Sequence, residues 1–192
     1  MDSKEISVVV VFAALTIVLN LSPFKIPAPY APFLYYQIWE IPIVAAFLIF
    51  GLRVGTGISI INTVVLLGVF PGESPTGPFY NLAAILSMLF GIYLVQRFFS
   101  SSLRQNQDVI KPASFTTLGI LFRVAFMTIV NWVFLPFPPP VGFSMPAEVT
   151  IAWLPLIGVF NATLALFTIP VGYILARIVS SSLRTDVGNK RS

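Results

Sequence analysis

Asparagine side chains recur within apolar stretches of this sequence, where an amide is able to recognise a ligand. Asn131 and Asn161 lie at a similar depth in two such stretches, and Asn81 opens another. An amide offers two donors and an acceptor with two lone pairs. Several amides in one cavity could therefore recognise, through hydrogen bonds, a heterocycle that carries adjacent carbonyl and ring N–H groups. The alternative is that each amide makes hydrogen bonds between helices, as polar residues in membranes commonly do.

Two charged residues also fall within apolar stretches. Arg123 lies about ten residues into its stretch, roughly 15 Å deep at 1.5 Å per residue, which is too far for its side chain to reach the surface easily. We expect it to face the protein interior, where the nearest candidate partner is Glu40, just before Pro42. The hypothesis is an ion pair or a shared polar network, and the function of Arg123 stays open.

Several kinds of chemistry are excluded by residue types that are missing. The sequence contains no His and no Cys, so it lacks the usual zinc and haem ligands, a thiol nucleophile and an imidazole base. We therefore predict no metal site, no cofactor and no enzymatic activity. No mid-span carboxylate is present to couple transport to ions, and no glycine-rich phosphate loop with its lysine occurs. If the protein moves a solute uphill, another subunit must supply the energy.

The elements that must position these residues are membrane-spanning helices. Of the 192 residues, 57% are hydrophobic and only 9% are charged, whereas soluble domains carry about 25% charged residues. At about 20 residues per span, we predict an all-α integral membrane bundle of six helices that forms one domain over residues 1–192. The predicted spans are Ile6–Ser22, Trp39–Val54, Gly55–Phe70, Phe79–Phe98, Ala113–Pro136 and Ile151–Ile178.

The division between the second and third spans is the least marked. Arg53, with glycines on both sides, indicates a tight turn at a membrane surface. One long broken helix is the alternative interpretation.

The basic residues predict the orientation in the plasma membrane. With a cytoplasmic N-terminus only Lys25 falls outside, which agrees with the positive-inside rule. Both termini are then cytoplasmic. We interpret the net charge of +4 as a determinant of membrane orientation and not as a sign of nucleic-acid binding. The basic residues assigned to the cytoplasmic side are Lys4, Arg53, Arg97, Arg104, Lys111, Arg177, Arg184, Lys190 and Arg191.

Most of the 16 prolines fall in the three predicted outer loops. Proline fixes φ and removes a donor, so we expect stiff, non-helical outer loops. The first loop, Pro23–Ile38, is a candidate lid. Trp39, Trp132 and Trp153 also lie towards the outer side, which predicts either an interfacial aromatic belt or an aromatic-lined pocket.

One short motif occurs twice. The segments Arg97-Phe-Phe-Ser-Ser-Ser-Leu-Arg104 and Arg177-Ile-Val-Ser-Ser-Ser-Leu-Arg184 both follow a predicted span on the cytoplasmic side. The repetition indicates either a favourable interfacial helix end or a docking surface for a cytoplasmic partner.

Two segments resemble the substrate-binding S components of energy-coupling factor (ECF) vitamin transporters. They are Phe33-Leu-Tyr-Tyr-Gln-Ile-Trp-Glu-Ile-Pro42 and Phe50-Gly-Leu-Arg-Val-Gly55. The riboflavin-specific branch is the most similar. The residues that resemble it are Gly77-Pro78, Met127-Thr-Ile-Val-Asn-Trp132 and Pro155-Leu-Ile-Gly-Val-Phe-Asn161.

The resemblance implies a membrane subunit that captures a vitamin, in the first place riboflavin. It would dock on a coupling module of one transmembrane subunit and two ATPase subunits, and would deliver the ligand by toppling in the bilayer. Asn131 and Asn161 would bind the polar edge of the ligand. Tyr36, Trp39, Glu40 and Asn81 would lie at the pocket rim, and Ala13 and Ala14 would contact the transmembrane coupling subunit.

Three departures from the riboflavin branch leave the vitamin open. Leu164 stands where that branch has a Lys, Asn81-Leu-Ala-Ala84 lacks the usual flanking Glu, and Arg123 matches nothing in the family pattern. Thiamine, biotin or a similar vitamin is the alternative ligand. A multi-span scaffold that binds no small molecule is the alternative from another class, followed by a membrane enzyme.

Overall fold

The computed structural model describes residues 3–69, 75–98 and 110–189. Within these residues the chain forms six helices and one two-stranded hairpin, so the predicted six-helix bundle is confirmed. The elements are α1 (Ser3–Leu21), β1 (Ile26–Ala28), β2 (Ala31–Tyr36), α2 (Glu40–Phe50), α3 (Leu52–Val69), α4 (Thr76–Phe98), α5 (Ile110–Phe134) and α6 (Ala147–Asn189).

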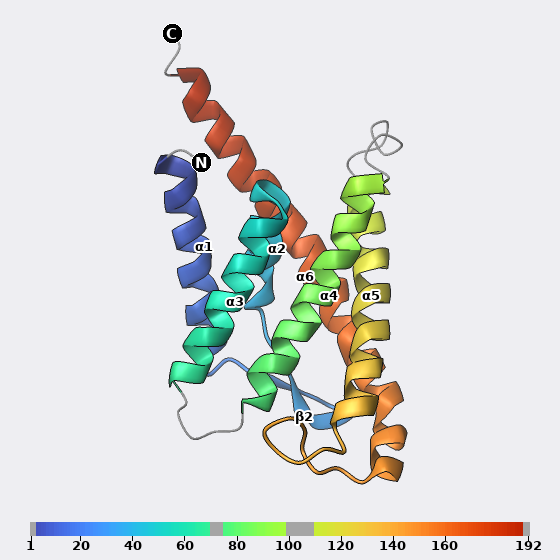
Figure 1. Ribbon diagram of the computed structural model, residues 1–192. Coiled ribbons are helices and arrows are strands. Elements are labelled where there is room, and N and C mark those ends of the chain that lie inside the picture. Colours follow the sequence, from blue (N-terminus) through green and yellow to red (C-terminus); the bar gives the residue numbers. More distant parts are fainter. Residues whose placement is uncertain (1–2, 70–74, 99–109, 190–192) are drawn as a thin grey trace.

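The helices run along one common direction, so the bundle has two distinct ends (Figure 1). At one end, which we call the basic end, α1 begins and α4 and α6 end. At the other, which we call the hairpin end, β1 and β2 lie beside the start of α6 and the end of α5. The first and last helices therefore place their outer ends on the same side of the bundle.

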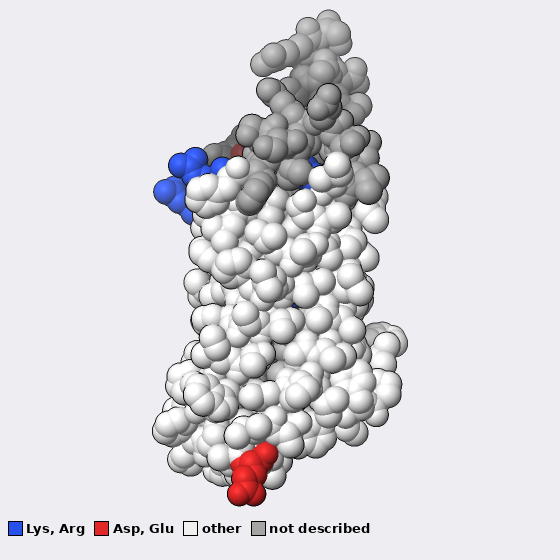
Figure 2. All heavy atoms as spheres, turned by 90° about the vertical axis from the view of Figure 1, so that its right-hand side faces the viewer, with Lys and Arg blue, Asp and Glu red and all other residues white. Residues whose placement is uncertain are grey.

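Basic side chains gather mainly at one of these ends. Figure 2 shows blue Lys and Arg side chains at the basic end and a red acidic tip at the opposite end, with a largely white surface between them. Arg53, Arg97, Lys111 and Arg177 lie in the helical segments at the basic end. The side chains of the other residues assigned to the cytoplasm lie outside the described part of the structure: Lys4, Arg104, Arg184, Lys190 and Arg191.

Four of the helices are long and apolar enough to cross a membrane: α3, α4, α5 and residues Ala147–Leu183 of α6. Together they make this a multi-span membrane protein. The first and second helices are shorter apolar helices, Glu5–Leu21 and Glu40–Phe50. The 11 residues of α2 rise only roughly 16 Å at 1.5 Å per residue.

The predicted turn between the second and third spans occurs at Gly51 and not around Arg53. The helix α2 ends at Phe50, Gly51 has φ 88°, and α3 begins at Leu52. Glycine reaches this left-handed conformation without steric cost, so one residue is enough for the turn. Arg53 therefore belongs to the first turn of α3.

The last helix is longer than the predicted span, because it continues to Asn189. Hydropathy falls after Ile178, but the polar residues that follow are compatible with a helix. Two prolines, Pro155 and Pro170, lie inside α6, where each removes a backbone donor.

The middle of α2 forms the centre of the bundle, since Ile43, Val44 and Phe47 have no exposed surface. Glycines let neighbouring helices approach closely around it. A Cβ atom on Gly91 would lie 2.5 Å from the carbonyl oxygen of Leu118, and one on Gly172 would lie 2.7 Å from Val44 Cγ1. These contacts hold α4 against α5 and α6 against α2.

The first outer loop forms a two-stranded hairpin, which its prolines alone do not predict. The strands β1 and β2 pair in antiparallel fashion, with Ile26 opposite Tyr36 and Pro27 opposite Tyr35. Both strands of a two-stranded sheet are edge strands, where proline is tolerated. The prolines therefore stiffen a hairpin instead of preventing one.

Candidate functional site

A cavity opens at the hairpin end between β2, α4, α5 and α6. Its wide outer chamber has a volume of about 450 Å³. Deeper along α5, past Asn131, an inner recess of about 100 Å³ reaches Arg123 and Glu40. Eight residues line both parts and make them continuous: Leu34, Tyr35, Gln37, Tyr80, Asn81, Asn131, Ile157 and Phe160.

The floor of the recess is a buried ion pair, as predicted. Arg123 donates from NH1 to Glu40 Oε2 at 2.5 Å and from NH2 to Oε1 at 2.9 Å. Both side chains are at most 3% exposed. A bidentate guanidinium–carboxylate contact satisfies the lone pairs and protons that make buried charges costly.

A third residue, Asn161, completes this network. Its Oδ1 accepts a hydrogen bond of 2.9 Å from Arg123 Nε, and its Nδ2 donates to the Ile157 carbonyl at 2.9 Å. Asn161 therefore orients Arg123 at the cavity floor. Asn131 differs, because its Nδ2 donates to the Met127 carbonyl at 2.6 Å, which leaves Oδ1 available to the cavity that this residue lines.

Two further polar groups on the cavity wall have no partner. Gln37 Oε1 and the Tyr80 hydroxyl are buried without a hydrogen bond among the described residues, and both residues line both parts of the cavity. Buried polar groups are nearly always paired, so each of these atoms is suited to a ligand. We did not single out either residue from the sequence. The only sign in the sequence that these residues belong to the site was their position in the chain. Gln37 lies two residues after Tyr35, and Tyr80 directly precedes the predicted site residue Asn81.

The structure brings most of the predicted site residues together. Trp39, Glu40, Asn131 and Asn161 are buried around the inner recess, and the exposed Asn81 borders it. Leu164, the position where the riboflavin branch has a Lys, lines the same recess and is buried.

Tyr36 is the exception, because it lines neither part of the cavity. Its neighbours Leu34, Tyr35 and Gln37 do line the cavity. Tyr36 instead packs on α6, with its ring centroid 5.0 Å from that of Phe160. Its expected place at the pocket rim is corrected to a contact between the hairpin and α6.

A chain of hydroxyl groups fixes this contact. Thr163 Oγ1 lies 2.8 Å from the Val159 carbonyl, which only accepts, so the threonine proton points there. Tyr36 must then donate to Thr163 at 2.6 Å, and Tyr30 to Tyr36 at 2.6 Å. Burial raises the pKa of the Tyr36 phenol above its usual value, so the group remains a donor at physiological pH.

The predicted coupling residues lie on two different faces of α1. Ala13 is half-buried and packs against the core cluster, whereas Ala14 is exposed. Ala14 is therefore the more accessible of the two residues. It shares an exposed surface with Val10, Val11 and Val18.

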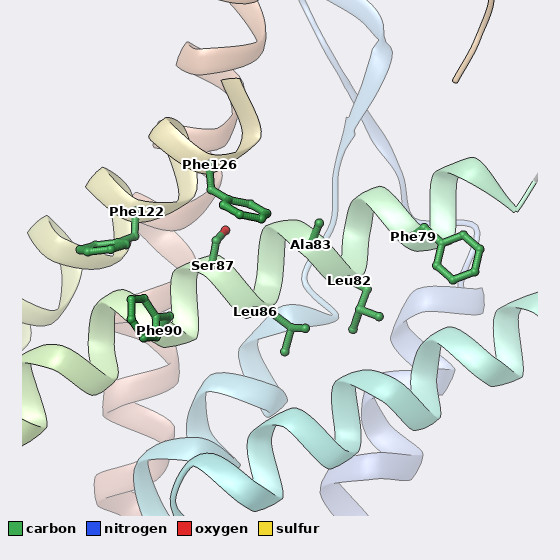
Figure 3. Close-up of a pocket in the computed structure, with 8 residues that line it drawn as sticks. All are labelled: Phe79, Leu82, Ala83, Leu86, Ser87, Phe90, Phe122 and Phe126. Carbon is green, nitrogen blue, oxygen red and sulfur yellow. The ribbon is translucent and has the colours of Figure 1, made fainter. Parts of the chain in front are cut away.

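A separate groove of about 560 Å³ lies on the outside of α4 and α5 (Figure 3). Phenylalanines from both helices surround it, and its one hydroxyl, on Ser87, donates to the Ala84 carbonyl at 2.9 Å. This groove offers no polar group to orient a heterocycle. Among the described residues, no group of three His, Cys, Asp or Glu side chains is placed to hold a metal ion.

A solved structure of the S component of a bacterial ECF transporter superposes on almost the whole chain. The TM-score is 0.72, with 19% identical residues, and the match covers 95% of this chain and 99% of the other. The chain has the S-component fold. Neither a protein-family profile nor a curated protein matches the sequence. The S-component fold accounts for the six helices.

Proposed function

We propose that this protein is the substrate-capture subunit of an ECF-type transporter and that riboflavin occupies the cavity at the hairpin end. The observation that carries the proposal is the pair of buried, unpartnered atoms on the cavity wall, Gln37 Oε1 and the Tyr80 hydroxyl. A group that is desolvated without a partner costs about 1–3 kcal/mol. A bound ligand that pairs with both atoms recovers that cost.

The size and lining of the cavity support a planar heterocycle. The outer chamber of about 450 Å³ lies within the range of roughly 300–1,000 Å³ that is common for small-molecule sites. Leu34, Ile157 and Phe160 provide apolar and aromatic walls, and the amides of Asn81 and Asn131 border them. Such walls can stack an isoalloxazine ring, while the amides hold its carbonyl and N–H edge.

Charge favours riboflavin over the alternative vitamins. The charged residues that line the cavity, Glu40 and Arg123, are committed to each other. A carboxylate ligand such as biotin finds no uncommitted cation among the described lining residues, and a cationic ligand such as thiamine finds no uncommitted carboxylate. A neutral ligand needs neither.

The same pair explains how this sequence departs from the riboflavin branch. Leu164 lacks the lysine of that branch, but Arg123 brings a cation from α5 to the recess that Leu164 lines. Arg123 also contacts Asn161, three residues before Leu164. We infer that the cation has moved from α6 to α5 and that Glu40 keeps the recess neutral.

The orientation and the partners follow from the same proposal. The basic end faces the cytoplasm and the cavity opens outside. A coupling module of one transmembrane subunit and two ATPases supplies the energy, and the exposed face of α1 around Ala14 contacts its membrane subunit. The protein itself catalyses no reaction.

Purification of the full chain tests the ligand directly. We expect a yellow preparation that quenches riboflavin fluorescence and binds riboflavin more tightly than biotin or thiamine. A colourless protein that ignores micromolar riboflavin would refute the riboflavin assignment. If it also ignored a panel of other vitamins, the scaffold alternative would replace substrate capture.

A further inference from the structure

The chamber at the hairpin end has two covers that come from different parts of the chain. One is the hairpin, which lines the outer chamber with residues of β2. The other is the connection between α5 and α6, residues 135–146, which we call the α5–α6 loop. It lines the same chamber with Leu135, Phe143 and Met145, and Figure 1 shows it beside β2. A ligand in the outer chamber would therefore touch both covers.

Backbone hydrogen bonds organise the α5–α6 loop. The Leu135 carbonyl accepts from the amides of Phe143 and Met145, both at 3.1 Å, and the Ser144 amide donates to the Phe137 carbonyl at 2.8 Å. Three successive amides of the segment that borders the chamber are thus bonded to the start of the same loop. Because these bonds satisfy the backbone groups within the loop itself, the loop is ordered before a ligand arrives.

The turn at Ser144 has an unusual backbone conformation. Among the residues that the structure describes, Ser144 is the one non-glycine residue with a positive φ, 54°. This left-handed conformation is uncommon outside glycine, and it persists where the surrounding structure enforces it, often at ligand sites. The Ser144 side chain is exposed and does not line the chamber, whereas its neighbours Phe143 and Met145 do. We therefore relate the strained turn to the placement of these two side chains.

The α5–α6 loop is attached to α4. Thr76 Oγ1, at the start of α4, donates to the Pro140 carbonyl at 2.8 Å. One turn further along α4, the ring of Tyr80 meets the ring of Phe143, with centroids 6.0 Å apart and planes at 71°. The hairpin instead rests on α6 through Tyr36. Since the two covers are attached to different helices, the hairpin can leave α6 while the loop stays on α4.

Phe143 combines an oriented ring with an uncovered surface. Tyr80 fixes the ring from one side, yet the residue is 51% exposed and borders the outer chamber. Aromatic pairs are favourable in offset-stacked and edge-to-face arrangements, so a planar ligand would gain from this surface. Phe137 of the same loop is also 51% exposed but lines neither part of the cavity. Phe143 is therefore the aromatic residue of the loop that a ligand in the chamber can reach.

We propose that Phe143 contacts and orients the flat ring of the ligand, and that the α5–α6 loop is a preformed wall against which the hairpin closes. The inference rests on the proposed function, because it requires a ligand with a planar ring. The isoalloxazine ring would lie against Phe143, with its polar edge towards the amides of Asn81 and Asn131, which border the same chamber.

Riboflavin titration of the full-length protein in detergent, followed by fluorescence quenching, tests the contact. Phe143→Leu should weaken binding about two- to tenfold, the effect of losing one aromatic contact, and Phe143→Tyr should retain most of the affinity. The unfolding midpoint of the empty protein should change little in Phe143→Leu, because the side chain is half-exposed. Phe137→Leu is the matched control, since it makes the same change at the same exposure in the same loop, and it should bind as the wild type does.

A spectroscopic signature separates direct contact from a structural effect. An indole stacked on a flavin adds a broad long-wavelength shoulder to the absorption of the flavin. Phe143→Trp should therefore show such a shoulder in the difference spectrum against the wild type, and Phe137→Trp should not. The native tryptophans are present in every variant and cancel in the difference.

Two substitutions at Ser144 test the preformed turn. Glycine reaches a positive φ without steric cost, whereas a β-branched residue opposes it. Ser144→Val should therefore bind riboflavin more weakly than Ser144→Gly. Equal affinity of the two variants would show that the turn does not place the ligand contact.

The outcomes distinguish this inference from the proposed function. A wild-type protein that bound no flavin would refute the proposed function itself. If the wild type bound riboflavin but Phe143→Leu bound it equally well, only the role of Phe143 would be wrong. Equal losses in Phe143→Leu and Phe137→Leu would indicate a general loosening of the loop, and a missing shoulder in Phe143→Trp would exclude stacking. Either result overturns the proposal.

Discussion

Arg123 of α5 donates hydrogen bonds to both carboxylate oxygens of Glu40 at the start of α2, at 2.5 and 2.9 Å. The two residues are 83 positions apart in the sequence, and their contact joins the helix that walls the cavity to the helix at the centre of the bundle. Since Asn161 of α6 also accepts from Arg123, three helices meet at one guanidinium. The floor of the cavity is therefore electrically neutral and mechanically fixed.

Arg123→Leu should leave Glu40 as an isolated buried charge. Removing one partner of a buried pair costs about 3–5 kcal/mol, so we expect a matching fall in the free energy of unfolding in detergent. The double variant Arg123→Leu/Glu40→Leu should recover most of this loss, because no unpaired charge remains. Equal stability of wild type and the single variant would show that the pair is not structural.

Tyr80→Phe should weaken ligand binding without lowering the stability of the protein. The phenol is buried without a partner among the described residues, so its removal should leave the unfolding midpoint of the empty protein unchanged or slightly higher. Loss of the hydrogen bond to the ligand should weaken riboflavin binding about five- to tenfold, as expected for roughly 1 kcal/mol. Fluorescence quenching measures the affinity.

Tyr93→Phe is the control for that experiment. Tyr93 lies on the same helix and packs against the core cluster, but it lines neither part of the cavity. It should leave the affinity as it is. Equal losses in both variants would point to an indirect effect of α4 and not to a contact with the ligand.

Tyr36→Phe should loosen the hairpin. It removes the hydrogen bonds with Tyr30 and Thr163 that hold β2 on α6. At about 1 kcal/mol for each bond, we expect the riboflavin off-rate to rise about tenfold or more, and shortening of the Pro23–Ile38 loop should raise it further. Stopped-flow fluorescence measures the rate, and Thr117→Val on the exposed side of α5 is the control. An unchanged off-rate would contradict gating by the hairpin.

Gly91→Ala should destabilise the α4–α5 contact. The added Cβ would lie 2.5 Å from the carbonyl oxygen of Leu118, and backbone of this kind cannot move aside as a flexible side chain can. Overpacking typically costs about 1–3 kcal/mol. Gly57→Ala has open space around its Cβ and should stabilise α3 by about 0.5–1 kcal/mol. Thermal unfolding compares the two variants, and a tolerated Gly91→Ala would show that α4 and α5 can separate.

The parts of the fold that hydropathy controls were predictable. Long apolar stretches identified the six helices, and the depth of Arg123 led to Glu40 because a buried cation needs a partner nearby. The structure places Trp39, Asn131 and Asn161 around one recess, and their part in ligand binding stays a prediction. The position of Arg123 was predictable because the cost of a charged group in hydrocarbon depends on the residue itself.

Other features depend on neighbours that the sequence does not show. The hairpin was missed because its prolines argue against a strand until one knows that both strands are edges. Tyr36 and Gln37 were hard to distinguish, because the register of β2 decides which of them faces the cavity. The Tyr80 hydroxyl is buried and the Tyr80 ring packs against Phe143, with centroids 6.0 Å apart, and helical spacing alone cannot predict either.

The shortness of α2 explains why there is room for a ligand at all. A helix that crosses the whole hydrocarbon layer needs about 20 residues, and α2 has 11. The inner recess of the cavity borders Trp39 and Glu40 at the start of α2, and residues of β2 line the outer chamber. The proposed ligand cavity thus lies at the end of a helix that is too short to cross the membrane. Evolution can reshape its walls through the hairpin, while the helices that anchor the protein in the bilayer stay untouched.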